Sequence, residues 1–177
     1  MDAQLKSIFG SWIEAIGTTV SAIASTPAKS ISTELQKDLS LIGNVLQATG
    51  SGLLADSVQT INLNKIGNQI EAIGNSTIIS EILLDFSEQT KQELNIKGNL
   101  LQALGGGLSF VDSLGQKPSK AQLYSIYGNL LQIIGNTLQA VAGGVSWRGG
   151  EASQLNTLGS WIQAIGAIIS ALAASNT

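Results

Sequence analysis

The chain contains no cysteine and no histidine, and only 12% of its 177 residues are charged. Without cysteine it has neither disulfides nor a thiolate metal site, and without histidine it lacks the commonest acid–base group and metal ligand. The net charge of −3 is spread over a chain with no basic run of the kind that binds nucleic acid. We therefore expect no metal, no cofactor, no nucleic-acid partner and no small-molecule substrate.

The main positive feature of the chain is a motif of eight residues, here called the phrase, that occurs six times. Each copy runs from one glycine to another, with Asn or Ser in second place, Leu or Ile in fourth and Gln or Glu in fifth. Self-similarity of this kind indicates one supersecondary unit used repeatedly. The copies begin at Gly10, Gly43, Gly67, Gly98, Gly128 and Gly159.

Apolar residues in and around each copy follow a helical period, and the alternation typical of strands is not visible. On a heptad, the glycines and aliphatics form one arc, and the second and fifth places form the opposite face. We predict an all-α fold, a single domain over residues 1–177 in which six antiparallel helices of about 31-residue units form a compact bundle. The expected helices cover residues 4–25, 33–56, 62–85, 92–113, 120–142 and 152–174.

Helix boundaries have weaker signals. Ser32 or Thr33, and Ser119, are typical helix starts, because a hydroxyl there can accept a hydrogen bond from the first turn. Gly143 and Gly144 are expected to lie in the connection after the fifth helix.

The presence of glycines inside the helices needs a physical explanation, because a glycine in a helix interior lowers helix stability by about 1 kcal/mol relative to alanine. Two glycines one heptad apart clear a line along which another backbone can approach, so we predict that they pack helix against helix. The alternative, that each glycine ends a helix, fits less well, because the apolar spacing continues through both. The predicted packing residues are Gly10, Gly17, Gly43, Gly50, Gly67, Gly74, Gly98, Gly105, Gly128, Gly135, Gly159 and Gly166.

Tryptophan distinguishes the terminal copies from the inner ones. Trp12 and Trp161 occupy the third place of the first and last copies, and we expect them to cover the ends of the stack, or to face each other if the bundle closes. Trp147 stands beside Arg148 in a glycine-rich stretch. Its side chain is expected to fold over the bundle end, with a partner contact as the alternative.

Catalytic chemistry finds little support. Glu14 and Glu71 stand in the fifth place of copies one and three, where two carboxylates could act as acid and base or bind a hard cation. The other four copies carry glutamine there, so the place requires a polar side chain rather than a charge. No arrangement of nucleophile and base accompanies them, and we expect no enzyme activity and no catalytic residue.

Two interpretations of function remain. The first is a non-enzymatic structural or interaction protein, a homo-oligomer that self-associates through the amide-rich helix faces. The alternative is a membrane-active bundle whose C-terminal hairpin, residues 121–177, inserts into bilayers. Residues 121–147 and 152–177 contain no charge and exceed the ~20 residues that cross a bilayer. The regular face of amides nevertheless favours a soluble bundle.

The GNxLQAIG phrase, with GSWIQAIG in the last copy, resembles a group of repetitive helical proteins of Bacillus-type Gram-positive bacteria that have no characterised function. The resemblance covers all six copies. It implies a bacterial origin and a cytoplasmic setting, with spore or envelope association as the alternative, and it brings no activity, ligand or site residue.

Overall fold

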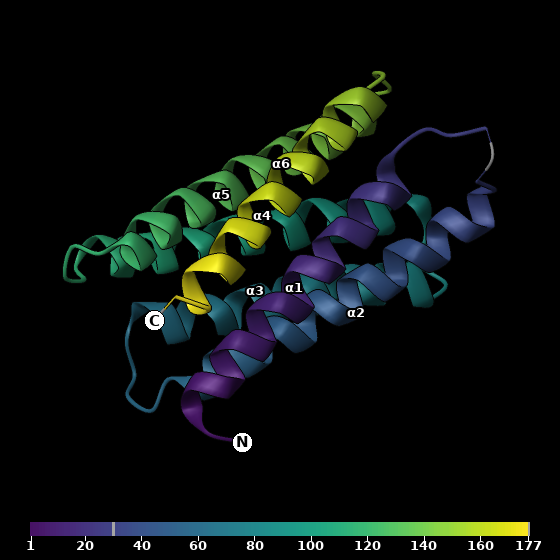
Figure 1. Ribbon diagram of the computed structural model, residues 1–177. Coiled ribbons are helices and arrows are strands. Elements are labelled where there is room, and N and C mark those ends of the chain that lie inside the picture. The colour runs from purple at the N-terminus through teal and green to yellow at the C-terminus, as the bar shows by residue number, and fades with distance from the viewer. Residues whose placement is uncertain (30, 177) are drawn as a thin grey trace.

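Six long helices lie side by side in the computed structural model, which describes residues 1–29 and 31–176 (Figure 1). This described part contains no strand, so the prediction of an all-α fold is confirmed. The helices are α1 (Ala3–Ser25), α2 (Thr33–Ser57), α3 (Leu63–Leu83), α4 (Glu88–Leu114), α5 (Lys120–Trp147) and α6 (Ser153–Ala174).

Five of the six helices begin at a side-chain cap. In each case the residue before the helix accepts a hydrogen bond from a backbone N–H in the first turn, which satisfies one of the free donors there. Ser32 has this role for α2, rather than the alternative Thr33, and Ser119 has it for α5. The other caps are Asp2, Asn62 and Ser87.

Two helix boundaries differ clearly from the expected ones. Helix α4 begins at Glu88 rather than at residue 92, and α5 continues to Trp147 rather than ending at residue 142. The expectation that Gly143 and Gly144 lie in a connection is therefore wrong. A Cβ atom on Gly143 would lie 2.7 Å from Cγ1 of Ile96, so this glycine accommodates α4. The positive φ of 79° that favours glycine occurs after the helix, at Gly149.

The helices form a closed ring. Each helix has its backbone beside the preceding and following helices, and α6 also lies beside α1. Consecutive helices run in opposite directions, as Figure 1 shows. In the described part of the chain, no helix backbone approaches another across the ring. The centre of the ring is therefore filled by side chains alone.

Glycines meet in pairs where α1 lies on α2, α3 on α4 and α5 on α6. A Cβ atom added to any of these glycines would lie only 2.5 to 2.9 Å from the carbonyl oxygen of its partner glycine. Real Cβ atoms do not come so close to backbone oxygens, so the helix separation at these points leaves no room for a side chain. The pairs are Gly10–Gly50, Gly17–Gly43, Gly67–Gly105, Gly74–Gly98, Gly128–Gly166 and Gly135–Gly159.

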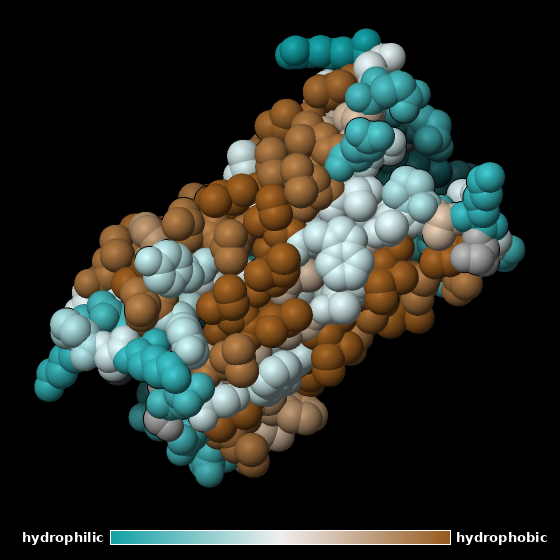
Figure 2. All heavy atoms as spheres, turned by 45° about the horizontal axis from the view of Figure 1, so that its top comes forward, coloured by the Kyte–Doolittle hydropathy of each residue, from teal (hydrophilic) through white to brown (hydrophobic). Residues whose placement is uncertain are grey.

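The core has the opposite composition from the one expected. The aliphatic arc was expected to fill the core, with the amides on the remaining face. Instead, the buried apolar residues are alanines and a single larger one, Ile78, among the described residues. Large apolar side chains such as Phe9, Leu104 and Ile165 are more than half exposed. Figure 2 shows apolar residues over much of the visible flank of the molecule, with the most hydrophilic residues gathered toward its two ends.

The physical reason for this inversion lies in the position of the glycines. Because the helices touch along their glycines, the residues on either side of that line point in opposite directions. The Asn, Ser, Gln and Glu places turn to the inside of the ring, the Leu or Ile of the fourth place is half-buried, and the apolar residues of the third and seventh places turn outside. The amide face is consequently enclosed within the ring rather than exposed on the surface of the molecule.

The role of the glycine contacts can be tested with two substitutions in one helix. In Gly50→Ala the new Cβ would lie 2.6 Å from the Gly10 oxygen, whereas Gly52→Ala would find nothing within 4 Å. We expect Gly50→Ala to lower the free energy of unfolding by about 1–3 kcal/mol through overpacking. Gly52→Ala should raise it by up to about 1 kcal/mol through helix propensity. Unfolding followed by circular dichroism measures both, and equal effects would contradict a packing role.

Candidate functional site

Three residues of each copy line the inside of the ring. They are the residue after the first glycine, the residue after the second glycine, and the Gln or Glu in fifth place. Because the phrase spans two turns of helix, these places fall on one stripe that faces the ring centre. Most are less than 9% exposed, although they are polar. The buried polar members are Ser11, Glu14, Thr18, Asn44, Gln47, Ser51, Asn68, Glu71, Asn75, Asn99, Gln102, Gln132, Asn136, Ser160 and Gln163.

The interior divides into two cavities that share no lining residue. Side chains on a helix tilt toward its N-terminus, and consecutive helices in the ring are antiparallel, so that every second helix runs in the same direction. The fifth-place residues of α2, α4 and α6 therefore lean toward one end of the ring, and those of α1, α3 and α5 toward the other. Each set borders its own cavity.

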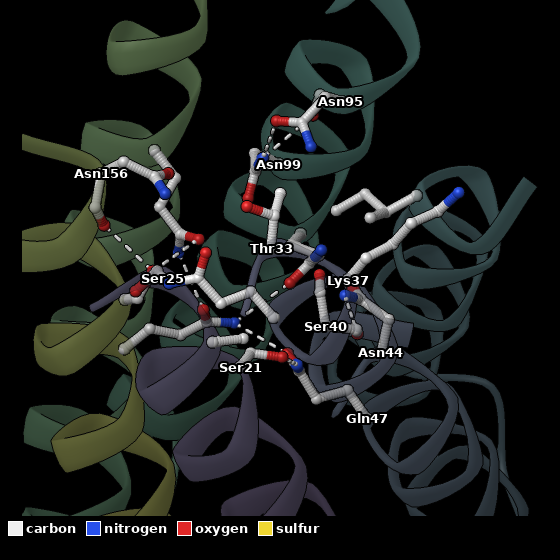
Figure 3. A pocket seen from close by; sticks show the side chains of 17 residues that line it. Ser21, Ser25, Thr33, Lys37, Ser40, Asn44, Gln47, Asn95, Asn99 and Asn156 are labelled. Carbon is white, nitrogen blue, oxygen red and sulfur yellow. Dashed lines mark hydrogen bonds between the residues drawn. The ribbon is translucent and has the colours of Figure 1, made fainter. Parts of the chain in front are cut away.

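The first cavity, here the amide cavity, has a volume of about 330 Å³ and is shown in Figure 3. It extends from Thr33 and Lys37, near the start of α2, inward to the glutamines of α2, α4 and α6. Asn44 of α2 and Asn99 of α4 both line it, each with its amide nitrogen donating to the backbone carbonyl four residues earlier. Figure 3 shows how these polar side chains converge from several helices.

Four glutamines that line the amide cavity form the amide cluster, which we define as Gln47, Gln102, Gln139 and Gln163. Nε2 of Gln163 donates to Oε1 of Gln47 at 3.0 Å and to Oε1 of Gln102 at 3.1 Å. Oε1 of Gln163 in turn accepts from Nε2 of Gln139 at 2.8 Å. These bonds join α2, α4, α5 and α6 across the ring, so the amide cluster connects helices whose backbones are not neighbours.

The second cavity, here the carboxylate cavity, has a volume of about 190 Å³. Glu14 of α1 and Glu71 of α3 both line it and are 7% and 8% exposed. Within residues 1–29 and 31–176 neither carboxylate forms an ion pair, and no group of three His, Cys, Asp or Glu residues could hold a metal ion. Two acidic groups are thus enclosed among neutral polar neighbours.

The terminal tryptophans do not cover the ends of a stack. Trp12 and Trp161 are 38% and 40% exposed and lie along the contact of α1 with α6. Nε1 of Trp12 donates to Ser175, and Nε1 of Trp161 donates to Thr26. They therefore occupy opposite ends of one seam rather than facing each other, because a closed ring has no terminal repeat to cover. Trp147 is the last residue of α5 and is 40% exposed.

Some interior residues were missed in the sequence. Asn75 and Asn136, each directly after a second glycine, have buried side-chain oxygens with no hydrogen-bond partner, and so does Ser109. Gln139, a member of the amide cluster, also lies outside the phrase. The recurrence of small or polar residues after the second glycine is the signal that could have indicated them. It was hidden by the assumption that the polar face meets solvent.

A model of a family of unknown function, DUF6944, matches residues 5–171. The chain belongs to this family. No curated protein and no solved structure matches the chain. The family match covers at least part of every helix of the ring, so this DUF6944 domain is the whole of the fold described above.

The contribution of the amide cluster in this DUF6944 protein can be tested at its centre. Gln163→Leu removes the donor to Gln47 and Gln102 and leaves their buried oxygens unpaired. Since an unpaired buried polar group costs about 1–3 kcal/mol, we expect a loss of roughly 2 kcal/mol or more in the free energy of unfolding. Gln69→Leu, at an exposed site, is the matched control, and it should change stability by less than about 0.5 kcal/mol. Equal unfolding midpoints for the two variants would contradict a structural role for the amide cluster.

Proposed function

We propose that this protein is a non-enzymatic, membrane-spanning helical ring whose polar interior provides a path for water and small polar solutes. One observation carries the proposal: large apolar side chains point outward and amides point inward. In water the opposite arrangement is favoured, because burial of apolar surface is the main driving force for folding. In a bilayer the outward apolar side chains are in contact with lipid.

Every helix of the ring carries exposed apolar side chains. We define the outer belt as one exposed apolar residue near the middle of each helix: Ile16, Val45, Ile73, Leu104, Ile134 and Ile165. Their exposed fractions range from 40% to 57%. Exposed apolar patches that are large and contiguous mark protein or membrane contacts. A partner protein on one side would cover two or three of these helices, whereas lipid covers all six.

Helix length and charge placement agree with a bilayer. The helices have 21 to 28 residues, which corresponds to about 32–42 Å at 1.5 Å per residue and exceeds the ~30 Å of a hydrocarbon core. Apart from the enclosed Glu14 and Glu71, charged residues lie near helix ends or in connections. Lys97 is the one farthest from an end, and it pairs with Glu93 one turn closer to the start of α4.

Hydropathy averaged along each helix gives a weaker signal than the outer belt does. Among the described residues, only α6 is long and apolar enough by composition to cross a membrane. Such an average combines both faces of a helix, so the inward amides of the other helices offset their outward leucines and isoleucines. The half-exposed tryptophans at the two ends of the α1–α6 seam are also typical of lipid–water interfaces.

Self-association is the second candidate, and the same outer belt favours it. Copies of the chain would then cover one another's apolar flanks, since the amide faces are enclosed and unavailable. The presence of outer-belt residues on all six helices favours lipid, because pairwise contacts between rings leave part of the outer belt exposed. An envelope location of the protein follows from the first candidate, in place of the cytoplasmic one.

Membrane insertion can be tested by a charge placed on the outer belt. Ile165→Glu should prevent most of the protein from co-floating with phosphatidylcholine–phosphatidylglycerol liposomes, because a carboxylate in the bilayer centre costs about 2.5–3.5 kcal/mol. Ile61→Glu is the matched control: Ile61 is 83% exposed but lies in the connection between α2 and α3, and flotation should be unchanged.

The same liposomes can report on the polar path. Wild-type protein should release entrapped small ions and retain large dextrans, and lipids with brominated tails should quench the tryptophan fluorescence. A monodisperse monomer in detergent-free buffer that does not float with liposomes would overturn the proposal. Large soluble oligomers without lipid binding would instead support self-association.

A further inference from the structure

The carboxylate cavity contains two acidic groups without a cation. Glu14 and Glu71 both border it, and in the described part of the chain no lysine or arginine pairs with either carboxylate. Enclosed charges are normally paired or coordinate an ion, because leaving water without compensation is costly. Burial raises the pKa of Glu14 to about 7 and the pKa of Glu71 well above its usual value. Each carboxyl therefore either keeps its proton or shares a cation that enters the cavity.

The neutral groups of the cavity also present oxygen atoms. Amide nitrogens of its lining residues are already engaged: Nδ2 of Asn68 donates to the backbone oxygen of Asn64 at 2.8 Å, and Nε2 of Gln132 donates to Ser170 at 3.2 Å. Nδ2 of Asn129 donates to Oγ of Ser113 at 3.1 Å. Each of these amides keeps a carbonyl oxygen that can contact a ligand.

An independent observation points to an occupant. Ser109 lines the same cavity, is only 5% exposed, and its hydroxyl has no hydrogen-bond partner. A buried hydroxyl without a partner is uncommon and requires an explanation such as a bound ion or water. The hydroxyl oxygen has lone pairs that can coordinate a cation.

The amide cavity provides an internal contrast. There, the side-chain oxygens of Gln47, Gln102 and Gln163 all accept hydrogen bonds within the amide cluster, and Lys37 lies in the wall. Its chemistry is therefore unfavourable for a cation. The two ends of the ring thus differ, although the repeat that builds them is the same.

We propose that the carboxylate cavity binds a monovalent alkali-metal cation between Glu14 and Glu71, with Ser109 and amide oxygens as further ligands. Because burial raises the pKa of both carboxyls, one of them keeps its proton and the pair presents a single negative charge, which suits a monovalent ion. Ca²⁺ sites generally combine more oxygen ligands from several acidic groups. A volume of about 190 Å³ admits the ion with part of its water shell. The inference deepens the proposed function, because the site would lie on the polar path of the ring.

The site can be tested without a membrane. Detergent-solubilised protein is equilibrated with radiolabelled Rb⁺ or Na⁺, with N-methylglucamine chloride maintaining the ionic strength, and bound ion is measured by dialysis. Wild type should show saturable binding of one of these ions. Glu14→Gln and Glu71→Gln should each weaken binding about tenfold or more, because each removes a charged ligand. Glutamine stands in that place in the other four phrases, so these variants retain a side chain that the fold already accepts.

Two further variants complete the test. Glu81→Gln removes a carboxylate that borders a different cavity and should leave binding unchanged. Ser109→Ala should weaken binding by a few-fold without loss of helicity, which provides a second measure if a glutamate variant unfolds. No saturable binding by wild type, or equal binding by wild type and both glutamine variants, would overturn the inference. Ion binding in detergent together with no ion release from liposomes would retain the site and reject the proposed path.

Discussion

The arrangement of this protein depends on how closely its helices approach at paired glycines. At six points the carbonyl oxygen of one glycine lies where the partner glycine would carry a Cβ atom. This approach fixes which side of each helix meets its neighbour, and the remaining sides are then divided between the inside and the outside of a ring. Because the fifth place of the phrase falls inside, a closed ring necessarily encloses six Gln or Glu residues.

The interior is therefore held by hydrogen bonds rather than by large apolar side chains. Gln163 bonds to glutamines of two helices that it does not touch through its backbone. Such bonds are directional, and each unpaired buried group costs stability, so a polar interior specifies one arrangement more strictly than an interior of leucines does. Not every buried polar group finds a partner, and the side-chain oxygen atoms of Asn75, Asn136 and Ser109 are left available to water or to a ligand.

The two ends of the ring differ through only a few departures from the repeat. Glutamate replaces glutamine in α1 and α3, whose fifth-place side chains lean toward the same end of the ring. Both carboxylates consequently border one cavity. At the other end, the glutamines of the amide cluster hydrogen-bond to one another. The difference between the two ends of the ring thus arises from two substitutions in an otherwise uniform pattern.

The sequence alone determined the helices, their approximate bounds and the places where glycine recurs, because these depend on a local period of 3.6 residues. The helix caps at Ser32 and Ser119 could also be predicted from the sequence, since a cap is a contact within one turn of helix. Which face of each helix is buried was decided only by the tertiary structure. A periodic pattern separates an apolar from a polar face but carries no information on whether water or lipid lies outside. The meeting of Glu14 with Glu71, and of Gln163 with Gln47 and Gln102, likewise required ring closure, because these residues are remote in the chain and become neighbours only when α6 reaches α1.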